Sequence, residues 1–366
     1  MRVLIVRLSA LGDVIQGLPC LVALKESFPD WRISWLTEAP NAAVLDGHPH
    51  LDRLFLLDRG WRRGVAPLNP VNLGRGGSNA LAVWSALRRA RFDLAIDLQG
   101  LFKSGLWTFL SGAPRRLGHG GTREYADRFL TEIVSRRPTF DPAYPLIERY
   151  LDPARHLGAD PSKARYVLPP PTEAALAEAD RLLGPPPSLR PLIGVCPWSA
   201  WPSKNWPLPH WRALAAALAR EARVLILGGA ENAADAAAAF SDTEGAEDLV
   251  GRTPLPVLAE LLRRCRLVIG PDSGPLHLAN ATNAPKVLML FGATSRRRSG
   301  PWGAVHRALA RDLDCQPCFK RICPLGHFAC LRELAPERVL DMAREMLSES
   351  PKRSSLRPSF SPKTSS

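Results

Sequence analysis

The residues with the clearest chemistry lie around a polar turn, residues 272–274 (Asp-Ser-Gly), which joins an aliphatic run at 267–269 to an apolar segment beginning at Pro275. The aliphatic run is typical of a buried strand, and the apolar segment is typical of a helix. Such a turn points free backbone N–H groups and the positive end of the helix dipole at one place, which suits a phosphate or a diphosphate. Asp272 and Ser273 are also ordinary helix N-caps, so the turn by itself supports both interpretations.

A second candidate site lies at Asp13, between a predicted strand at residues 2–7 and a predicted helix at 13–27. In an open α/β sheet, the carboxyl end of such a strand faces the crevice in which these sheets bind ligands. A carboxylate held there could act as a general base, and Gly12 lets a ligand approach the backbone closely. The alternative is that Asp13 only caps the helix.

Two further loops follow predicted strands in the second half of the chain. The loop after the strand at 192–196 contains Ser199 and Lys204, which could bind a phosphate through a hydroxyl and an ammonium group. The alternative for Lys204 is an ordinary exposed lysine. Glu231 follows the strand at 223–227 and could accept hydrogen bonds from two ribose hydroxyls, or could cap a helix. The chain has no G-x-G-x-x-G motif, so a dinucleotide site is poorly supported.

Strands and helices alternate through both halves of the chain, which predicts an α/β fold with mostly parallel sheets. At 366 residues the chain exceeds the usual size of a single core, ~250–300 residues, so we expect two domains. The proline-rich stretch 169–188, with a helix at 172–183, is the expected linker. The glycine-rich stretch 58–78 is expected to be a long functional loop. The predicted strands are 2–7, 32–36, 53–57 and 93–97 in the first half, and 192–196, 223–227, 266–269 and 286–290 in the second.

The formal net charge of +13 is large, and four of these charges lie in a Ser- and Pro-rich tail, 350–366, which we expect to be disordered. Such a surplus favours a phosphorylated or carboxylated partner, an anionic membrane surface or nucleic acid. Scattered solvated arginines are the alternative. The N-terminus lacks the apolar run of a signal peptide, and no uncharged run approaches ~18 residues, so we expect a soluble protein made in the cytosol.

Four of the seven cysteines form a cluster with the spacing C-x2-C-x4-C-x6-C. A structural zinc site is one interpretation of this spacing, and conditional thiols or disulfides are the others. The remaining three cysteines are isolated in apolar surroundings and are expected to be reduced core residues. The clustered residues are Cys315, Cys318, Cys323 and Cys330, and the isolated ones are Cys20, Cys196 and Cys265.

Over about residues 1–345 the chain resembles glycosyltransferase family 9, the bacterial lipopolysaccharide heptosyltransferases, because several motifs occur in the family's order. The basic stretch 59–63 (Arg-Gly-Trp-Arg-Arg) resembles a loop of heptosyltransferase I, which adds the first heptose to the Kdo inner core. The motifs are Arg-Leu-Ser-Ala-Leu-Gly-Asp-Val at 7–14, Ile-Asp-Leu-Gln-Gly-Leu-Phe-Lys-Ser at 96–104, Lys-Asn-Trp-Pro at 204–207 with Trp211, Gly-Gly-Ala-Glu at 228–231, and Asp-Ser-Gly-Pro-Leu-His-Leu-Ala at 272–279.

This resemblance implies the GT-B architecture, in which two doubly wound, Rossmann-like domains face each other across a cleft. Residues 1–168 would bind the acceptor, and residues 189–335 would bind the nucleotide-sugar after the linker at 169–188. A last helix at 336–349 would pack back on the first domain. The resemblance also implies an inverting enzyme that needs no metal and no cofactor, with ADP-heptose as a substrate.

The resemblance further assigns roles to individual residues. Asp13 would be the general base. Four residues would hold the diphosphate and help ADP to leave, Glu231 would bind the ribose, Thr253 would lie near the adenine, and two residues would face the heptose. The diphosphate-binding residues would be Ser199, Lys204, Ser273 and Gly274, and the two facing the heptose would be Asp272 and His277. The acceptor-binding residues would be Arg62, Arg63, Lys103 and Arg123.

Other functions stay open at this point. A family 9 transferase could add a later core heptose or a different sugar. A basic, zinc-containing nucleic-acid-binding protein would explain the charge and the cysteines, but it leaves Asp13 and Glu231 without a role and lacks interleaved aromatic residues. We therefore expect an enzyme with a Kdo-lipid A type acceptor and no nucleic acid partner, located at the cytoplasmic face of the inner membrane and in contact with its anionic surface.

Overall fold

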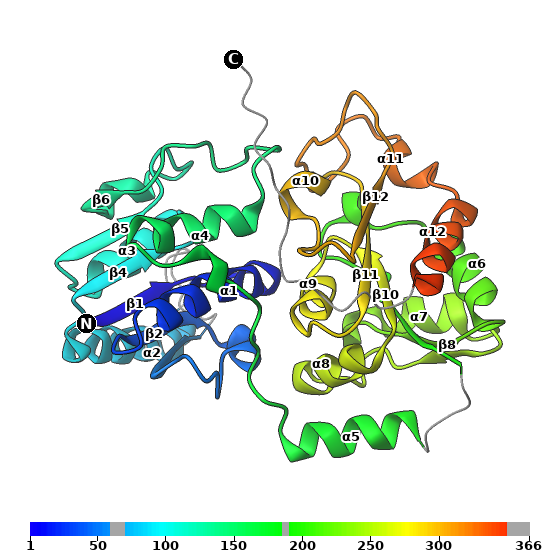
Figure 1. The fold of residues 1–366 in the computed structure, drawn as a ribbon, viewed down its shortest axis with the longest axis horizontal. Helices are drawn as coiled ribbons and strands as arrows, with labels where there is room; N and C mark the ends of the chain where they lie inside the picture. Colours follow the sequence, from blue (N-terminus) through cyan, green and yellow to red (C-terminus); the bar gives the residue numbers. More distant parts are fainter. Residues whose placement is uncertain (59–69, 185–189, 350–366) are drawn as a thin grey trace. The chain divides into compact units, whose positions relative to one another are not determined.

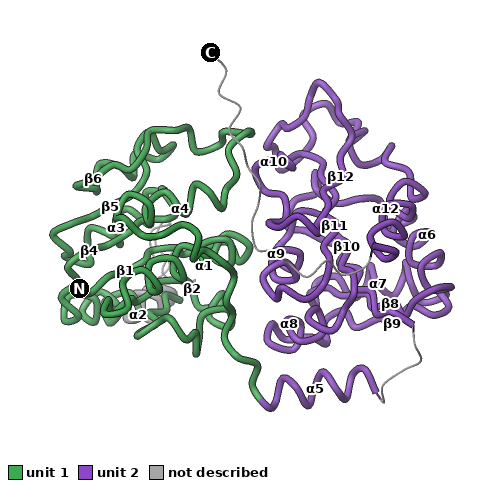
Figure 2. Tube along the Cα trace, in the orientation of Figure 1, with its two compact units in different colours: residues 1–172 green, residues 173–366 purple. Residues whose placement is uncertain are grey.

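The computed structural model describes residues 1–58, 70–184 and 190–349, and the chain divides into two compact units, residues 1–172 and 173–366 (Figure 2). The boundary falls inside the proline-rich stretch that the sequence marks as a linker. Each unit is built on its own six-stranded sheet, and every pair of neighbouring strands is parallel. This confirms the predicted α/β class. The predicted tail at 350–366 lies outside the described residues.

Unit 1 alternates strands and helices along the chain (Figure 1). Its elements are β1 (Arg2–Val6), α1 (Leu11–Ser27), β2 (Arg32–Glu38), η1 (Ala39–Val44), β3 (Arg53–Leu57), α2 (Pro70–Ala90), β4 (Leu94–Asp97), α3 (Phe102–Leu110), β5 (Arg115–Gly118), η3 (Ala126–Phe129), β6 (Glu132–Ile133), α4 (Leu146–His156) and η4 (Pro161–Lys163). The strand order is β3-β2-β1-β4-β5-β6. The winding therefore reverses between β1 and β4, and ligands of such sheets bind beside this switch point.

Unit 2 repeats the same topology, with the strand order β12-β11-β10-β7-β8-β9 and a switch point between β7 and β10. Its elements are α5 (Glu173–Leu183), β7 (Leu192–Val195), η5 (Pro202–Lys204), α6 (Leu208–Ala219), β8 (Arg223–Ile226), η6 (Ala230–Asn232), α7 (Ala233–Phe240), β9 (Ala246–Asp248), α8 (Leu255–Arg264), β10 (Leu267–Pro271), α9 (Gly274–Ala281), β11 (Lys286–Phe291), α10 (Arg296–Ser299), β12 (Arg307–Ala310), α11 (Ala329–Arg332) and α12 (Pro336–Ser348).

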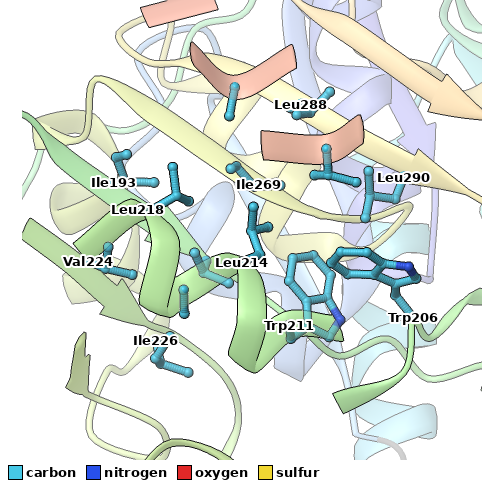
Figure 3. Packing of buried hydrophobic residues seen from close by; sticks show 14 of the residues in the cluster. Ile193, Trp206, Trp211, Leu214, Leu218, Val224, Ile226, Ile269, Leu288 and Leu290 are labelled. Carbon is cyan, nitrogen blue, oxygen red and sulfur yellow. The ribbon is translucent and has the colours of Figure 1, made fainter. Parts of the chain in front are cut away.

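The core of unit 2 forms where strand side chains meet the helix α6 (Figure 3). Aliphatic residues of the central strands pack against Leu214 and Leu218, and the rings of Trp206 and Trp211 meet edge to face at 4.8 Å. Gly270 is required in β10, because a Cβ there would collide with the backbone carbonyl of Cys196 as well as with the side chain of Leu276. This close contact sets α9 tightly against the carboxyl end of β10.

Helix α12 is the last described helix. Its buried face, formed by Val339, Ala343 and Met346, lies in the core of unit 2, where α12 packs against α6 and β10. The spacing of these residues at i, i+4 and i+7 gives one apolar stripe, and that stripe is covered by α6. The expected return of the helix at 336–349 to the first domain stays a prediction.

The strands that the sequence analysis missed are short or lie near the sheet edges. β5, β6, β9 and β12 have two to four residues and contain charged side chains, so no apolar run marks them. The expected loop at 58–78 is also partly wrong, because α2 begins at Pro70 despite its glycines. Helix propensity is a weak guide that the rest of the fold can override. Within the described residues, no helix has both the length and the apolar character needed to cross a bilayer.

Candidate active site

In unit 1, Asp13 lies in the first turn of α1, directly after β1 and beside the switch point. Its Oδ2 accepts a hydrogen bond from the Ala10 N–H at 3.2 Å, and its Oδ1 accepts one from the Tyr150 hydroxyl at 3.2 Å. The side chain is 32% exposed. The carboxylate is thus fixed in orientation and still accessible to a ligand, so Asp13 both caps its helix and is presented at the edge of the sheet.

A buried arginine compensates the charge of this carboxylate. The Arg7 guanidinium lies 2.6 Å from Asp13 Oδ2, is 7% exposed, and stacks over the Tyr150 ring at 5.3 Å. Burial by itself lowers the pKa of Arg7, but the negative charge of Asp13 offsets this effect and leaves the pKa above its ordinary value. Arg7 therefore holds a permanent positive charge against Asp13.

The turn after β4 is organised by Asp97. Its Oδ1 accepts hydrogen bonds from the N–H groups of Gln99 at 2.8 Å and Gly100 at 3.0 Å, and its Oδ2 accepts one from the Ser104 hydroxyl at 3.0 Å. Burial raises the pKa of Asp97, although these hydrogen bonds act against it. Gly100 has φ +68°, a conformation that other residues rarely adopt. The turn starts α3 and thereby places Lys103.

Lys103 reaches across the switch point to the chain around β1 and β2. Its Nζ donates to Ser9 Oγ at 2.8 Å and to Glu38 Oε1 at 3.3 Å. The side chain is 19% exposed, while Glu38 is almost fully buried. The structure thus places Lys103 in the same part of unit 1 as the loop that presents Asp13.

The other predicted acceptor residues are not gathered around Asp13 by any described contact. Arg123 is 63% exposed, and its guanidinium pairs with Glu124 Oε1 at 3.3 Å and stacks over the Phe140 ring at 5.6 Å. Arg62 and Arg63 lie outside the described residues.

In unit 2, Asp272 follows β10 directly and gathers polar groups from the segments after β7 and β11 and from α9. Lys204 Nζ lies 2.8 Å from its Oδ2, the Thr294 hydroxyl donates to Oδ2 at 2.8 Å, and His277 Nε2 lies 3.0 Å from Oδ1. Lys204 comes from the loop after β7, so the pair joins the two strands on either side of the switch point. The sequence analysis expected both residues in one site, and the structure brings them together.

Electrostatics stabilise the ionised form of Asp272. Burial by itself raises the pKa of this carboxyl, but the positive charge of Lys204 and the hydrogen bond with His277 lower it well below its ordinary value. Lys204 is 16% exposed, so its charge acts where water screens it weakly. The pair is therefore a fixed part of the fold, and the exposed-lysine alternative is wrong.

This depressed pKa predicts how stability depends on pH. Because the pKa of Asp272 is lower in the folded chain, its contribution is complete above the unfolded-state pKa, about 4, and is lost as pH falls further. We expect D272N to melt well below the wild type at pH 7, and the difference in Tm to narrow toward pH 3. Thermal unfolding at both pH values measures this, with D312N as the control because Asp312 is 82% exposed. A difference that is equal at both pH values contradicts the prediction.

The anion site predicted from the sequence falls at the start of α9. Ser273 is its N-cap residue, Gly274 begins the helix, and the first N–H groups of a helix have no partner within it. The Ser273 hydroxyl oxygen is buried and has no hydrogen-bond partner among the described residues. Together with the Lys204 ammonium beside Asp272, these donors can hold a phosphate group.

The Ser199 hydroxyl, predicted to bind a phosphate, forms its contacts within its own loop. It contacts the Trp201 carbonyl at 3.1 Å and Asn205 Oδ1 at 2.9 Å, so it closes the loop after β7 on itself. The Ser199 N–H also donates to Asn205 Oδ1 at 2.8 Å. Ser199 therefore shapes the loop that carries Lys204.

The last two residues predicted to bind the nucleotide-sugar, Glu231 and Thr253, lie after β8 and β9. Glu231 is exposed in η6, and its carboxylate occupies the space that a side chain at Gly229 would need. Thr253 is partly buried just before α8. The Gly251 N–H donates to the Gly228 carbonyl at 3.0 Å, which ties the two loops together. Both residues therefore lie at the carboxyl edge of the unit 2 sheet, where the sequence placed them.

Three residues that contact the predicted site residues are not predicted from the sequence. Arg7 falls within the predicted strand at 2–7, Tyr150 is 137 positions from Asp13, and Thr294 follows β11. Position at a strand end was an available signal for Arg7 and Thr294. No local signal marks Tyr150, because its role depends on α4 packing against α1.

The clustered cysteines are free thiols, and all four line a small cavity of about 20 Å³ together with Ser203. The described residues contain no group of three or more His, Cys, Asp or Glu side chains arranged to hold a metal ion. Backbone N–H groups of residues 325–328, that of Phe328 foremost, lower the pKa of Cys323. Burial raises the pKa of Cys330 to about 11. The three isolated cysteines are buried, as expected.

Comparisons with known proteins agree with this architecture. The chain is 29% identical over 328 residues to lipopolysaccharide heptosyltransferase 1 of Pseudomonas aeruginosa, covering 88% of this chain and 87% of that protein. It is 27% identical over 370 residues to lipopolysaccharide heptosyltransferase 2 of Salmonella typhimurium, covering 95% and 99%. Among solved structures, a glycosyl transferase family 9 protein from Veillonella parvula superposes with a TM-score of 0.76 at 21% identity, covering 95% and 97%. The E. coli heptosyltransferase WaaC with ADP superposes with a TM-score of 0.71 at 23% identity, covering 94% and 100%.

Two parallel, doubly wound sheets with these structural neighbours define the GT-B fold. The model of "Glycosyltransferase family 9 (heptosyltransferase)" matches residues 80–329. The chain belongs to glycosyltransferase family 9, the heptosyltransferases.

Proposed function

We propose that this chain transfers heptose from ADP-heptose to the Kdo inner core of lipopolysaccharide, with inversion at the anomeric carbon. The single observation that carries the proposal is the Lys204–Asp272 pair beside the buried Ser273 hydroxyl at the start of α9. This arrangement suits the diphosphate of a nucleotide-sugar, because it combines a fixed cation with helix N–H donors. The names of the relatives, lipopolysaccharide heptosyltransferases 1 and 2, support the sugar and the acceptor class.

In the proposed reaction, Asp13 accepts the proton of the acceptor hydroxyl while that oxygen attacks the anomeric carbon of the heptose. The bond between the anomeric carbon and the diphosphate oxygen breaks, and ADP leaves with the electron pair. The Lys204 ammonium and the N–H groups at the start of α9 stabilise the negative charge that develops on the leaving phosphate. Asp272 and His277 face the heptose, and no metal or other cofactor is needed in this scheme.

The residues proposed to bind the acceptor belong to unit 1. Lys103 and Arg123, with Arg62 and Arg63, would bind the carboxylates of Kdo and the phosphates of lipid A through their positive charges. An acceptor of this kind is part of a membrane, so we propose that the enzyme works at the cytoplasmic face of the inner membrane. The basic composition of the chain favours such a surface.

Glu231 provides a test of the nucleotide side. We expect E231Q to weaken ADP binding and to leave pyrophosphate binding unchanged, because only ADP carries a ribose whose hydroxyls a carboxylate can hold. A hydrogen bond to a charged group contributes about 1.5–3 kcal/mol, so Kd for ADP should rise about tenfold or more. Calorimetric titration with both ligands measures this, and E244Q is the control. Equal affinity for ADP in E231Q and the wild type would remove Glu231 from the site.

The reaction is tested by incubating the enzyme with ADP-heptose or a UDP-sugar and measuring the product mass on two acceptors, Kdo-lipid A and the same molecule already carrying one heptose. The proposal requires product with ADP-heptose and Kdo-lipid A. A second candidate is addition of a later heptose, which is favoured by the match to a heptosyltransferase 2 over 95% of this chain. Product only on the heptosylated acceptor would establish the second candidate.

A further inference from the structure

Besides Trp84 of α2, which is 42% exposed, the described residues of unit 1 expose four aromatic side chains on neighbouring elements. Phe102 is 53% exposed, Phe109 51%, Tyr125 65% and Phe140 45%, and all lie between the start of α3 and the chain that follows β6 (Figure 1). Water-exposed rings of this number are unusual on a protein surface unless they meet a partner. None of them takes part in the candidate active site, although Phe102 is next to Lys103 in the sequence.

Contacts link these rings into one surface. The Phe129 ring lies 5.4 Å from Phe102 and 6.1 Å from Phe109, so it joins both ends of α3 to η3. The Phe102 N–H donates to Glu124 at 3.1 Å, and Glu124 pairs with Arg123, whose guanidinium stacks over Phe140. Phe102, Phe109 and Phe140 are therefore connected through one set of contacts, and Tyr125 follows Glu124 directly in the chain.

Arginine side chains accompany the exposed rings. Arg116 lies 5.6 Å over Phe109, and Arg128 lies 4.9 Å over Tyr125. Arg128 is exposed and forms no ion pair with another described residue. Residues 102–144 contain seven Lys and Arg and four Asp and Glu, so the segment is net positive. We call the surface formed by Phe102, Phe109, Arg116, Arg123, Tyr125, Arg128 and Phe140 the aromatic–arginine face.

We propose that the aromatic–arginine face docks on a lipid bilayer that contains anionic phospholipids. Aromatic rings prefer the headgroup level of a membrane, where one part of the ring is apolar and the other is wet. Arginines beside them are attracted to anionic headgroups, and their side chains can also pack along the rings. This proposal rests on the proposed function in one respect only: docking would bring Lys103 and its loop to an acceptor embedded in the same membrane.

The experiment is co-sedimentation of the full chain with vesicles of phosphatidylcholine alone and of an equal mixture of phosphatidylcholine and phosphatidylglycerol. The wild type should bind the mixed vesicles and not the neutral ones, with less binding at high salt. R128A should bind about fivefold more weakly, since each basic residue near the surface contributes a factor of about five. Y125S/F140S should bind about tenfold more weakly, because two rings no longer enter the interface.

Matched variants in unit 2 serve as controls. I322S removes an apolar side chain that is 68% exposed, and R212A removes an arginine that is 51% exposed. Both should bind vesicles like the wild type. Thermal unfolding shows that every variant is folded, and vesicle binding is read without ADP or any transfer reaction, so a failure of the proposed function does not affect the result.

Three outcomes would overturn the proposal: no binding of the wild type to the mixed vesicles, equal binding of the face variants and the wild type, or an equal loss in the unit 2 controls. If the wild type binds but the face variants are unaffected, another part of the chain makes the contact. A self-associating wild type whose association is lost in Y125S/F140S, without vesicle binding, would assign the face to a second copy of the chain.

Discussion

Replacing Asp13 by asparagine is expected to lower kcat about 10²–10⁴-fold while Kd for ADP-heptose stays near that of the wild type. The factor is the usual loss when a general base is removed. Asparagine keeps one acceptor oxygen for the Ala10 N–H, and its amide NH2 can donate to the Tyr150 hydroxyl oxygen, so the side chain can keep its position but cannot take up the proton. ADP-heptose binding should be preserved, because the proposed donor residues belong to unit 2 and Asp13 belongs to unit 1.

The Asp13 experiment needs a control for the buried charge of Arg7. D13N leaves this guanidinium, which is 7% exposed, without its ion-pair partner, and such a loss can destabilise a fold by about 3–5 kcal/mol. The Tm of D13N and its affinity for ADP separate a folding defect from a chemical one. Y150F removes only one hydrogen bond to Asp13 and should lower kcat a few-fold, and D30N, a change at an exposed loop carboxylate, should have no effect. A kcat of D13N within tenfold of the wild type would show that another group accepts the proton.

The sequence predicted the parts of this fold that depend on local pattern. Buried parallel strands such as β1 and β10 are continuous aliphatic runs, so their positions were recognisable. Because the carboxyl ends of parallel strands share one edge, Lys204 and Asp272 could be assigned to one site although 68 residues separate them. Contacts that depend on how helices pack could not be predicted from the sequence. Tyr150 reaches Asp13 only because α4 packs on α1, and the apolar stripe of α12 does not indicate which hydrophobic core buries it.

The same limit explains the residues whose environment differs from expectation. A hydroxyl in a loop is a phosphate donor in one conformation and a loop-closing group in another, and Ser199 has the second role here because Asn205 is within reach. A cysteine spacing of C-x2-C and C-x6-C is shared by metal sites and by free thiols. The positions of the side chains in the folded chain, and not their order in the sequence, decide between such alternatives.

Replacing Lys204 by alanine is expected to raise Kd for ADP about 10- to 150-fold, which corresponds to the loss of a charge-assisted hydrogen bond of about 1.5–3 kcal/mol. Two of the three N–H donors of the ammonium group bind Asp272, through its carbonyl at 3.2 Å and its Oδ2 at 2.8 Å, which leaves one donor for a phosphate oxygen. S273A removes only a neutral hydroxyl, so its effect should be about half as large in free energy.

The buried carboxylate of Asp272 provides the control for this experiment. K204A alone leaves that carboxylate, which is 6% exposed, without its cation, so the variant should also have a lower Tm and should repel the diphosphate. K204A/D272N removes both charges and should recover part of the Tm. It should not recover ADP affinity, since the cation is still missing. Recovery of both properties would mean that Lys204 serves only to neutralise Asp272, and calorimetry with ADP alongside thermal unfolding distinguishes the two roles.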